Sequence, residues 1–177
     1  MKRRQFLKLS LMGGILVSFS GGGCMGLLAG KNKEELTVDS ALRKLDKFTN
    51  ATIVHLGQWS PYQIFTHCAQ SVEYSMSGYP EHDSDLFKST VGTLVFSYFS
   101  SQGKMSHDLT APVPGAPPIE IKEDSTSALV RLRKALMEFQ DYQGKLEPHF
   151  SYGELSKEEF TVAHVIHLNN HLEELKI

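Results

Sequence analysis

The sequence of 177 residues is poor in cysteine and tryptophan, with two cysteines (Cys24 and Cys68) and one tryptophan. Cys24 lies in an N-terminal stretch that we expect to be removed. Cys68 would then have no partner, so we expect no intramolecular disulfide. Such a fold depends on its core alone. A hydrophobic content of 41% in a chain of this length is ordinary for one globular domain.

Basic residues are scarce over most of the chain. Six of the 18 lysines and arginines precede Glu34, the first acidic residue. From Glu34 onward, 12 basic residues face 20 acidic ones, a balance of −8. An acidic body without a basic stripe argues against nucleic acid as the partner.

The chain also lacks a hydrophobic run strong enough for a permanent membrane span. The apolar run of residues 7–19 is short and rich in Gly and Ser, and it follows a basic start, which is the layout of an export signal. Its start, Lys2-Arg3-Arg4-Gln5-Phe6-Leu7-Lys8, resembles a twin-arginine (Tat) signal. That resemblance implies export of the folded protein to the periplasm or another extracytoplasmic location. We expect residues 1–33 to be this signal and a short linker; the alternative is an N-terminal anchor that stays attached.

Gly21-Gly22-Gly23-Cys24 resembles a degenerate lipoprotein box. We therefore consider two forms of the exported protein, one free and one held at the membrane by a lipid on Cys24. Beyond the signal or this lipid, we expect no membrane contact.

Residues 34–177 are predicted to form one all-α domain. Apolar residues at three-and-four spacing predict four principal helices, over residues 37–48, from 61 to about 77, from 126 to 144 and from 157 onward. Capping boxes at Ser60/Gln63 and Ser156/Glu159 support two of these starts, and Asp124 or Ser125 caps a third. Residues 85–101 fit an auxiliary helix, although residues 93–96 alone would suit a strand. No strand pair is convincing, so we expect a helical bundle.

A long loop interrupts the helices. Residues 103–122 contain four prolines and must be irregular. A loop of this length inside a compact domain is usually a lid, a binding loop or an arm that wraps the body.

The last predicted helix carries His164, His167 and His171. At the helical advance of about 100° per residue, the three side chains project within roughly 60° of one another. A row of imidazoles on one helix face is most often a metal site, and the alternative is a solvated face that happens to be rich in histidine. Two ligands do not make a tight site, so a third should come from a facing helix, where His67 is the best candidate.

The hydrophobic pattern places His67 in an open position. The main apolar stripe of its helix points nearly opposite to His67, and periodicity alone would leave His67 in water. The stripe consists of Phe65, Cys68, Ala69, Val72 and Met76. A metal ligand at this position needs an open cleft between helices.

Other chemically capable residues have weaker claims. Glu174 and Tyr74 are candidate proton carriers, but are better interpreted as neighbours of the ligands or as surface residues. His149 either reaches the mouth of the site or has a packing or turn role beside Pro148. We expect Cys68 to be a buried apolar residue and Trp59 to be a core anchor. We expect three further histidines to be solvated, namely His55, His82 and His107.

The combination of Trp59-Ser60 at a helix start, His67 in that helix and a distant pair of histidines resembles the DinB/YfiT-like metalloenzyme superfamily. Within it, the chain is similar to one family of unassigned function. The similarity covers nearly all of residues 36–175, and it is carried by residues 59–64, 71–78, 114–118, 148–156 and 164–172.

This resemblance implies a DinB-like four-helix bundle that binds a divalent ion, most often zinc or nickel. The implied metal ligands are His67 and a His-x-x-x-His pair, here His167 and His171, and His164 is an alternative to His167. Relatives include thiol-dependent transferases and isomerases, and bundles of this superfamily often form homodimers.

Two functions follow from the sequence. The first is an exported protein with one His-ligated divalent metal, acting on a small-molecule substrate as a transferase or hydrolase. The second is a helical bundle without catalysis, in which metal binding is incidental or structural and the Pro-rich loop binds a partner.

Overall fold

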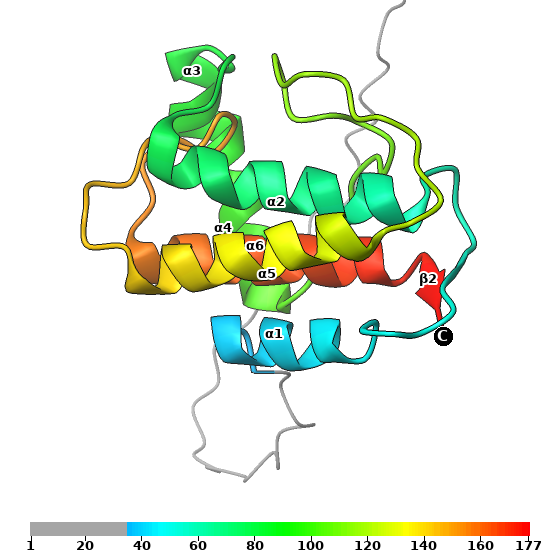
Figure 1. Cartoon of the computed structure of the whole chain (residues 1–177). Helices are drawn as coiled ribbons and strands as arrows, with labels where there is room; N and C mark the ends of the chain where they lie inside the picture. Colours follow the sequence, from blue (N-terminus) through cyan, green and yellow to red (C-terminus); the bar gives the residue numbers. More distant parts are fainter. Residues whose placement is uncertain (1–34) are drawn as a thin grey trace, which may run out of the picture. The chain divides into compact units, whose positions relative to one another are not determined.

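The structure is a computed structural model that describes residues 35–177, and this part of the chain is mostly helical (Figure 1). The predicted signal of residues 1–33 and the start of the domain at residue 34 lie outside the described residues. None of the described helices is long and apolar enough to cross a membrane.

Four long helices form a ring of neighbours. They are α1 (Val38–Asp46), α2 (Pro61–Ser77), α5 (Thr126–Asp141) and α6 (Lys157–Leu172). Helix α2 packs against α5 and α6, and α1 contacts the same two helices (Figure 1). The core lies between them and includes the largest fully buried side chains, Phe65, Phe139 and Phe160.

Local sequence fixes where these helices begin. The side chains of Thr37, Ser60 and Ser156 each accept a hydrogen bond from the backbone N–H of the third residue of the helix that follows. The side chain of that third residue in turn accepts a hydrogen bond from the backbone N–H of the cap residue. Both predicted capping boxes are therefore confirmed. Helix α2 ends at Ser77, and its C-cap Gly78 has a φ of 100°, which is strained for any residue with a Cβ.

Helix α5 is shorter than predicted and begins differently from the other three. Ser125 is its N-cap without a side-chain hydrogen bond, and Asp124 Oδ1 instead accepts from the Thr126 N–H. The helix ends at Asp141 with Tyr142 as C-cap, before Gly144. The predicted core stripe is confirmed, because all six of its members are buried: Ala128, Leu129, Leu132, Ala135, Leu136 and Phe139.

The predicted auxiliary helix of residues 85–101 is helical but divided. It consists of α3 (Asp85–Phe87), a π-helical turn η1 (Lys88–Gly92) and α4 (Thr93–Gln102). Gly92 explains the irregular turn, because a Cβ at this position would collide with the backbone carbonyl of Ser151. The extra residue of a π turn accommodates this close approach of the 149–153 turn.

The expectation of no strand pair was wrong. Strands β1 (Val54–His55) and β2 (Leu175–Lys176) form a two-residue antiparallel ladder, extended by a bond from the Leu56 N–H to the Glu174 carbonyl. It joins the segment before α2 to the end of α6, near the label C in Figure 1.

The Pro-rich loop is irregular, as predicted, and it packs against the helices. Val113 is buried in the core, and the Pro117 carbonyl accepts a hydrogen bond from the side chain of Gln70 on α2. The loop therefore covers a face of α2 that the hydrophobic pattern assigns to solvent.

Candidate metal centre

Four imidazole rings meet between α2, α6 and the Pro-rich loop. His67 comes from α2, His167 and His171 come from α6, and His107 comes from the loop. One ring nitrogen of each lies within 4.8 Å of the others. The three histidines predicted as ligands therefore lie together, and a fourth joins them.

The ring nitrogens approach at distances close to those around a metal ion. His167 Nε2 lies 3.1 Å from His67 Nε2 and 3.1 Å from His171 Nε2. Tetrahedral zinc with Zn–N bonds of about 2.0–2.1 Å separates its ligand nitrogens by roughly 3.3–3.4 Å. Both observed distances are therefore close to the spacing of ligand nitrogens around zinc.

His67 is buried, which corrects the expectation of a solvated position. Its side chain is only 3% exposed, and His171 is fully buried at 0%. The pattern fails because α2 is covered on more than its apolar side: α5 and α6 pack on it, and the loop reaches Gln70. Helix α6 is likewise covered on more than one side, because it contacts α1, α2 and α4. The cluster is therefore only partly enclosed: His67 and His171 are buried, whereas His107 and His167 are half-buried.

Burial keeps these histidines neutral. It lowers the pKa of His67 to about 4, with a smaller contribution from His107. Burial lowers the pKa of His171 to about 2, assisted by His67 and His107, and it holds the pKa of His167 well below the ordinary value. A neutral imidazole keeps the lone pair that a metal needs, so all three rings can act as ligands at neutral pH.

His107 was expected to be solvated, and this was wrong. Its Nδ1–H donates to Asn170 Oδ1 at 3.0 Å, which leaves the lone pair on Nε2. Nε2 is buried without a hydrogen-bond partner among the described residues. His107 lies outside the helices, so no hydrophobic periodicity in the sequence indicates that it is a ligand. The available signal was a histidine inside a loop already predicted to be a lid or binding loop.

The orphaned Nε2 of His107 fits a bound cation. It is buried without a partner within residues 35–177, and a buried unpaired polar atom costs about 1–3 kcal/mol. A metal ion bound by the four rings would offset part of this cost, and the donor set of neutral imidazoles suits a divalent transition metal. The Nδ1 atoms of His67 and His171, which are also buried without a partner in this part of the chain, belong to rings whose Nε2 atoms face the cluster.

Trp59 forms one wall of the cluster. Its ring stacks on His171 with an interplanar angle of 4°, and it meets His67 edge-on at a centroid distance of 5.0 Å. Trp59 also packs against the core, so the predicted anchor role is confirmed, and the same side chain restrains two imidazoles.

His164 lies outside the group of four. It is 3% exposed, its Nε2 lies 3.2 Å from Ser75 Oγ, and it packs between Phe139 and Phe160. Burial lowers its pKa to about 3. In this arrangement His164 does not take the place of His167.

The remaining candidate residues lie outside the cluster of four histidines. Cys68 is buried and burial raises the pKa of its thiol, as expected of an inert apolar residue. Glu174 is half-buried beside Gly57, with Oε2 unpartnered in the described part of the chain. Tyr74 packs on Tyr79. His55 and His82 are exposed, as predicted.

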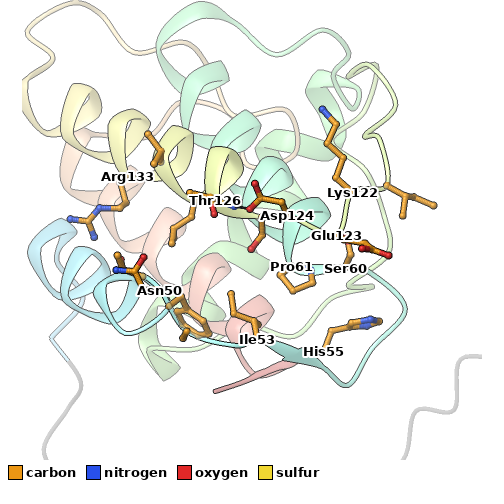
Figure 2. A pocket seen from close by; sticks show the side chains of 17 residues that line it. Asn50, Ile53, His55, Ser60, Pro61, Lys122, Glu123, Asp124, Thr126 and Arg133 are labelled. Atoms are coloured by element: carbon orange, nitrogen blue, oxygen red, sulfur yellow. Dashed lines mark hydrogen bonds between the residues drawn. The ribbon is translucent and has the colours of Figure 1, made fainter.

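A pocket of about 250 Å³ opens next to the cluster, lined by His67, His107 and His167 together with the Pro-rich loop and the 149–153 turn. A separate pocket of about 640 Å³ lies where the segment before α2 meets the start of α5 (Figure 2). Its walls include Lys122, Asp124 and Arg133 but none of the four clustered histidines. The first pocket is therefore the one connected to the candidate metal centre.

Comparison with known proteins identifies one family. A family model described as "Protein of unknown function (DUF1569)" matches residues 31–177. No curated protein and no solved structure matches the chain.

Proposed function

This chain belongs to the DUF1569 family, whose function is unknown, and we propose that it is a metalloprotein that binds one divalent ion at its four clustered histidines. The observation that carries the proposal is the convergence of four imidazoles from three separate segments within 4.8 Å. His67, His167 and His171 are the ligands fixed on helices, and His107 is the ligand supplied by the loop.

The donor set favours zinc or nickel. Imidazole nitrogen suits zinc, copper, iron and nickel, whereas magnesium and calcium prefer oxygen. The group of four contains no carboxylate among the described residues. Zinc and nickel are the ions implied by the resemblance to the DinB/YfiT-like superfamily.

Because His107 comes from a loop, it can leave the metal and open one coordination position to another ligand. His107 is held by one hydrogen bond to Asn170, whereas the other three rings are fixed on packed helices. When His107 withdraws, three ligands remain, as in catalytic zinc sites. A metal with an open position acts as a Lewis acid and activates a bound water or thiolate. We therefore propose a transferase or hydrolase that acts on a small molecule.

The second candidate is a structural metal site without catalysis. Four protein ligands close the coordination shell, as they do in structural zinc sites. The bond that orients His107 favours this alternative, because it presents the Nε2 lone pair to the cluster without a substrate.

Metal analysis of protein purified without a His tag tests the proposal. We expect one metal per chain in the wild type and loss of metal in His67→Ala and His171→Ala. His55→Ala, at an exposed histidine outside the cluster, is the matched control and should bind metal as the wild type does. A wild type without stoichiometric metal, or two cluster variants that hold as much as the wild type, would refute the proposal.

Cobalt substitution then separates the two candidates. Added imidazole should change the visible spectrum of the wild-type cobalt protein if His107 exchanges. If the site is structural, only His107→Ala should respond.

We further propose a DinB-like four-helix bundle and export by the Tat route. The ring of contacts among α1, α5, α2 and α6 supports the bundle, and Lys2-Arg3-Arg4-Gln5-Phe6-Leu7-Lys8 supports export. A lipid on Cys24 and a homodimer stay predictions, as does the exclusion of nucleic acid by the balance of −8. Cell fractionation of a variant with Arg3 and Arg4 replaced by lysine tests the export route: unchanged export would refute it.

A further inference from the structure

The 250 Å³ pocket extends from the cluster along two antiparallel helices. His67 faces His167, and Ser75, two turns further along α2, faces His164 on α6. The pocket begins at His67 and His167 and continues past Ser71 and Ala163 to the 149–153 turn. A ligand in it would therefore reach the metal with one end only.

The pocket walls carry no formal charge. None of the described residues that line the pocket is Asp, Glu, Lys or Arg, and most of the loop residues in its wall are apolar, such as Met105, Pro112 and Val113. Its histidines add no charge either, because burial lowers the pKa of His149 and of His164 to about 3. A ligand charge buried here would lose its hydration without gaining an oppositely charged side chain.

His149 supplies a fixed hydrogen-bond donor. Its Nδ1 accepts from the N–H groups of Ser151 and Tyr152 at 3.1 and 3.2 Å. The neutral ring therefore carries its proton on Nε2. The side chain is only 7% exposed and stacks on Tyr152 at a centroid distance of 4.3 Å, so the ring cannot turn freely. The Nε2–H makes no hydrogen bond within residues 35–177 and is available to a ligand.

We infer that this pocket binds the substrate of the metal centre, and that the substrate is a small, largely apolar molecule with one metal-binding head. Its body carries no charge, and an acceptor atom on it receives the His149 Nε2–H. The inference rests on the proposed metal site. It adds the substrate class and identifies His149 as a binding residue. The pocket is smaller than the range of about 300–1,000 Å³ that drug-sized ligands occupy.

Three benzyl thiols with the same head test the inference on zinc-loaded protein by calorimetry. They are benzyl mercaptan, para-acetylbenzyl mercaptan and para-carboxybenzyl mercaptan. The acetyl and carboxylate groups have nearly the same shape, so they differ mainly in charge. We expect the carboxylate to bind at least about 100-fold more weakly than the ketone. Equal binding, or tighter binding of the carboxylate, would overturn the inference.

Two variants test the walls. His149→Asn keeps an acceptor for the turn amides and removes the Nε2–H. In the wild type, the ketone should bind with about threefold to tenfold higher affinity than benzyl mercaptan. In His149→Asn the two thiols should bind with equal affinity. Met105→Lys places a cation in the loop wall and should raise the affinity of the carboxylate relative to the ketone. Unchanged preferences in both variants would refute the assigned pocket.

Metal content measured on the same samples separates the two failures. If the protein binds zinc and the thiols show no discrimination, the pocket inference fails and the metal site stands. If the protein binds no zinc, the metal site fails and the inference fails with it.

Discussion

The histidines of this protein differ in what surrounds each imidazole ring. His55 and His82 are exposed, whereas His67, His164 and His171 are buried. Within the buried group, His164 is bound by a neighbouring hydroxyl, and the rings of the cluster face one another. The residue type alone therefore does not identify a ligand; the convergence of several imidazole rings does.

The burial of His164 should make the protein less stable in acid. Its folded pKa of about 3 lies below the ordinary 6.5, so the unfolded state binds the proton first as the pH falls. The stability that depends on a neutral His164 is present above pH 6.5 and is lost as the pH falls toward 3. Between pH 7 and 5 this single group should cost about 2 kcal/mol of unfolding free energy.

Urea denaturation of the wild type and His164→Asn at the two pH values measures this effect. The variant cannot gain the proton but keeps a polar group for Ser75. Its loss of stability between pH 7 and 5 should be about 2 kcal/mol smaller than that of the wild type. Equal pH dependence in the two proteins would show that His164 is not a buried neutral group.

For the individual histidines, the sequence predicted which helical rings come together but not how far each ring is buried. The spacing of His167 and His171 is local, and the need for a third ligand from a facing helix indicated His67, which the resemblance also implies. The burial of His67 and the presence of His107 depend on the loop, whose path over α2 has no periodicity. Metal binding by these residues stays a prediction.

Among the secondary-structure elements, the helix starts were the most predictable feature. In each of the pairs Ser60/Gln63 and Ser156/Glu159, the two residues bind each other's backbone N–H within four residues of sequence. A local sequence pattern is therefore enough to predict the helix start. The π turn η1 was not predictable, because it depends on Gly92 meeting Ser151 far along the chain. The β1–β2 pair is only two residues long and joins distant segments, so it also leaves no local pattern.

Removal of the cap of α6 should destabilise the fold without emptying the metal centre. Ser156→Ala removes the side-chain acceptor of the Glu159 N–H and should lower the unfolding free energy by about 1 kcal/mol. Ser125→Ala is the matched control, because this cap residue makes no side-chain bond, and its effect should stay within about 0.5 kcal/mol.

Denaturant titration measures both variants, and metal analysis should give the wild-type content for each. His167 and His171 lie at the far end of α6 from Ser156. Equal stability losses in the two variants would contradict the role of the Ser156 cap.

For the whole molecule, metal binding should contribute to stability. A ligand that binds only the folded state stabilises it by RT ln(1 + [L]/Kd), about 2.7 kcal/mol at a free concentration of one hundred times Kd. Zinc should therefore raise the melting temperature of the wild type and of His55→Ala, and a chelator should reverse the rise. His67→Ala should respond weakly. A melting temperature independent of zinc in the wild type would contradict a site formed by folding.

The spacing of the ligands along the chain has a consequence for the order of events in folding. His67 and His167 are 100 residues apart. Bringing them together requires α2 and α6 to dock, and the closure of so long a loop comes after local helix formation. Metal capture should then follow the rate-limiting step, so that it slows unfolding and leaves the folding rate nearly unchanged. A loaded chain would outlast an empty one under protease whenever cleavage is faster than reclosing.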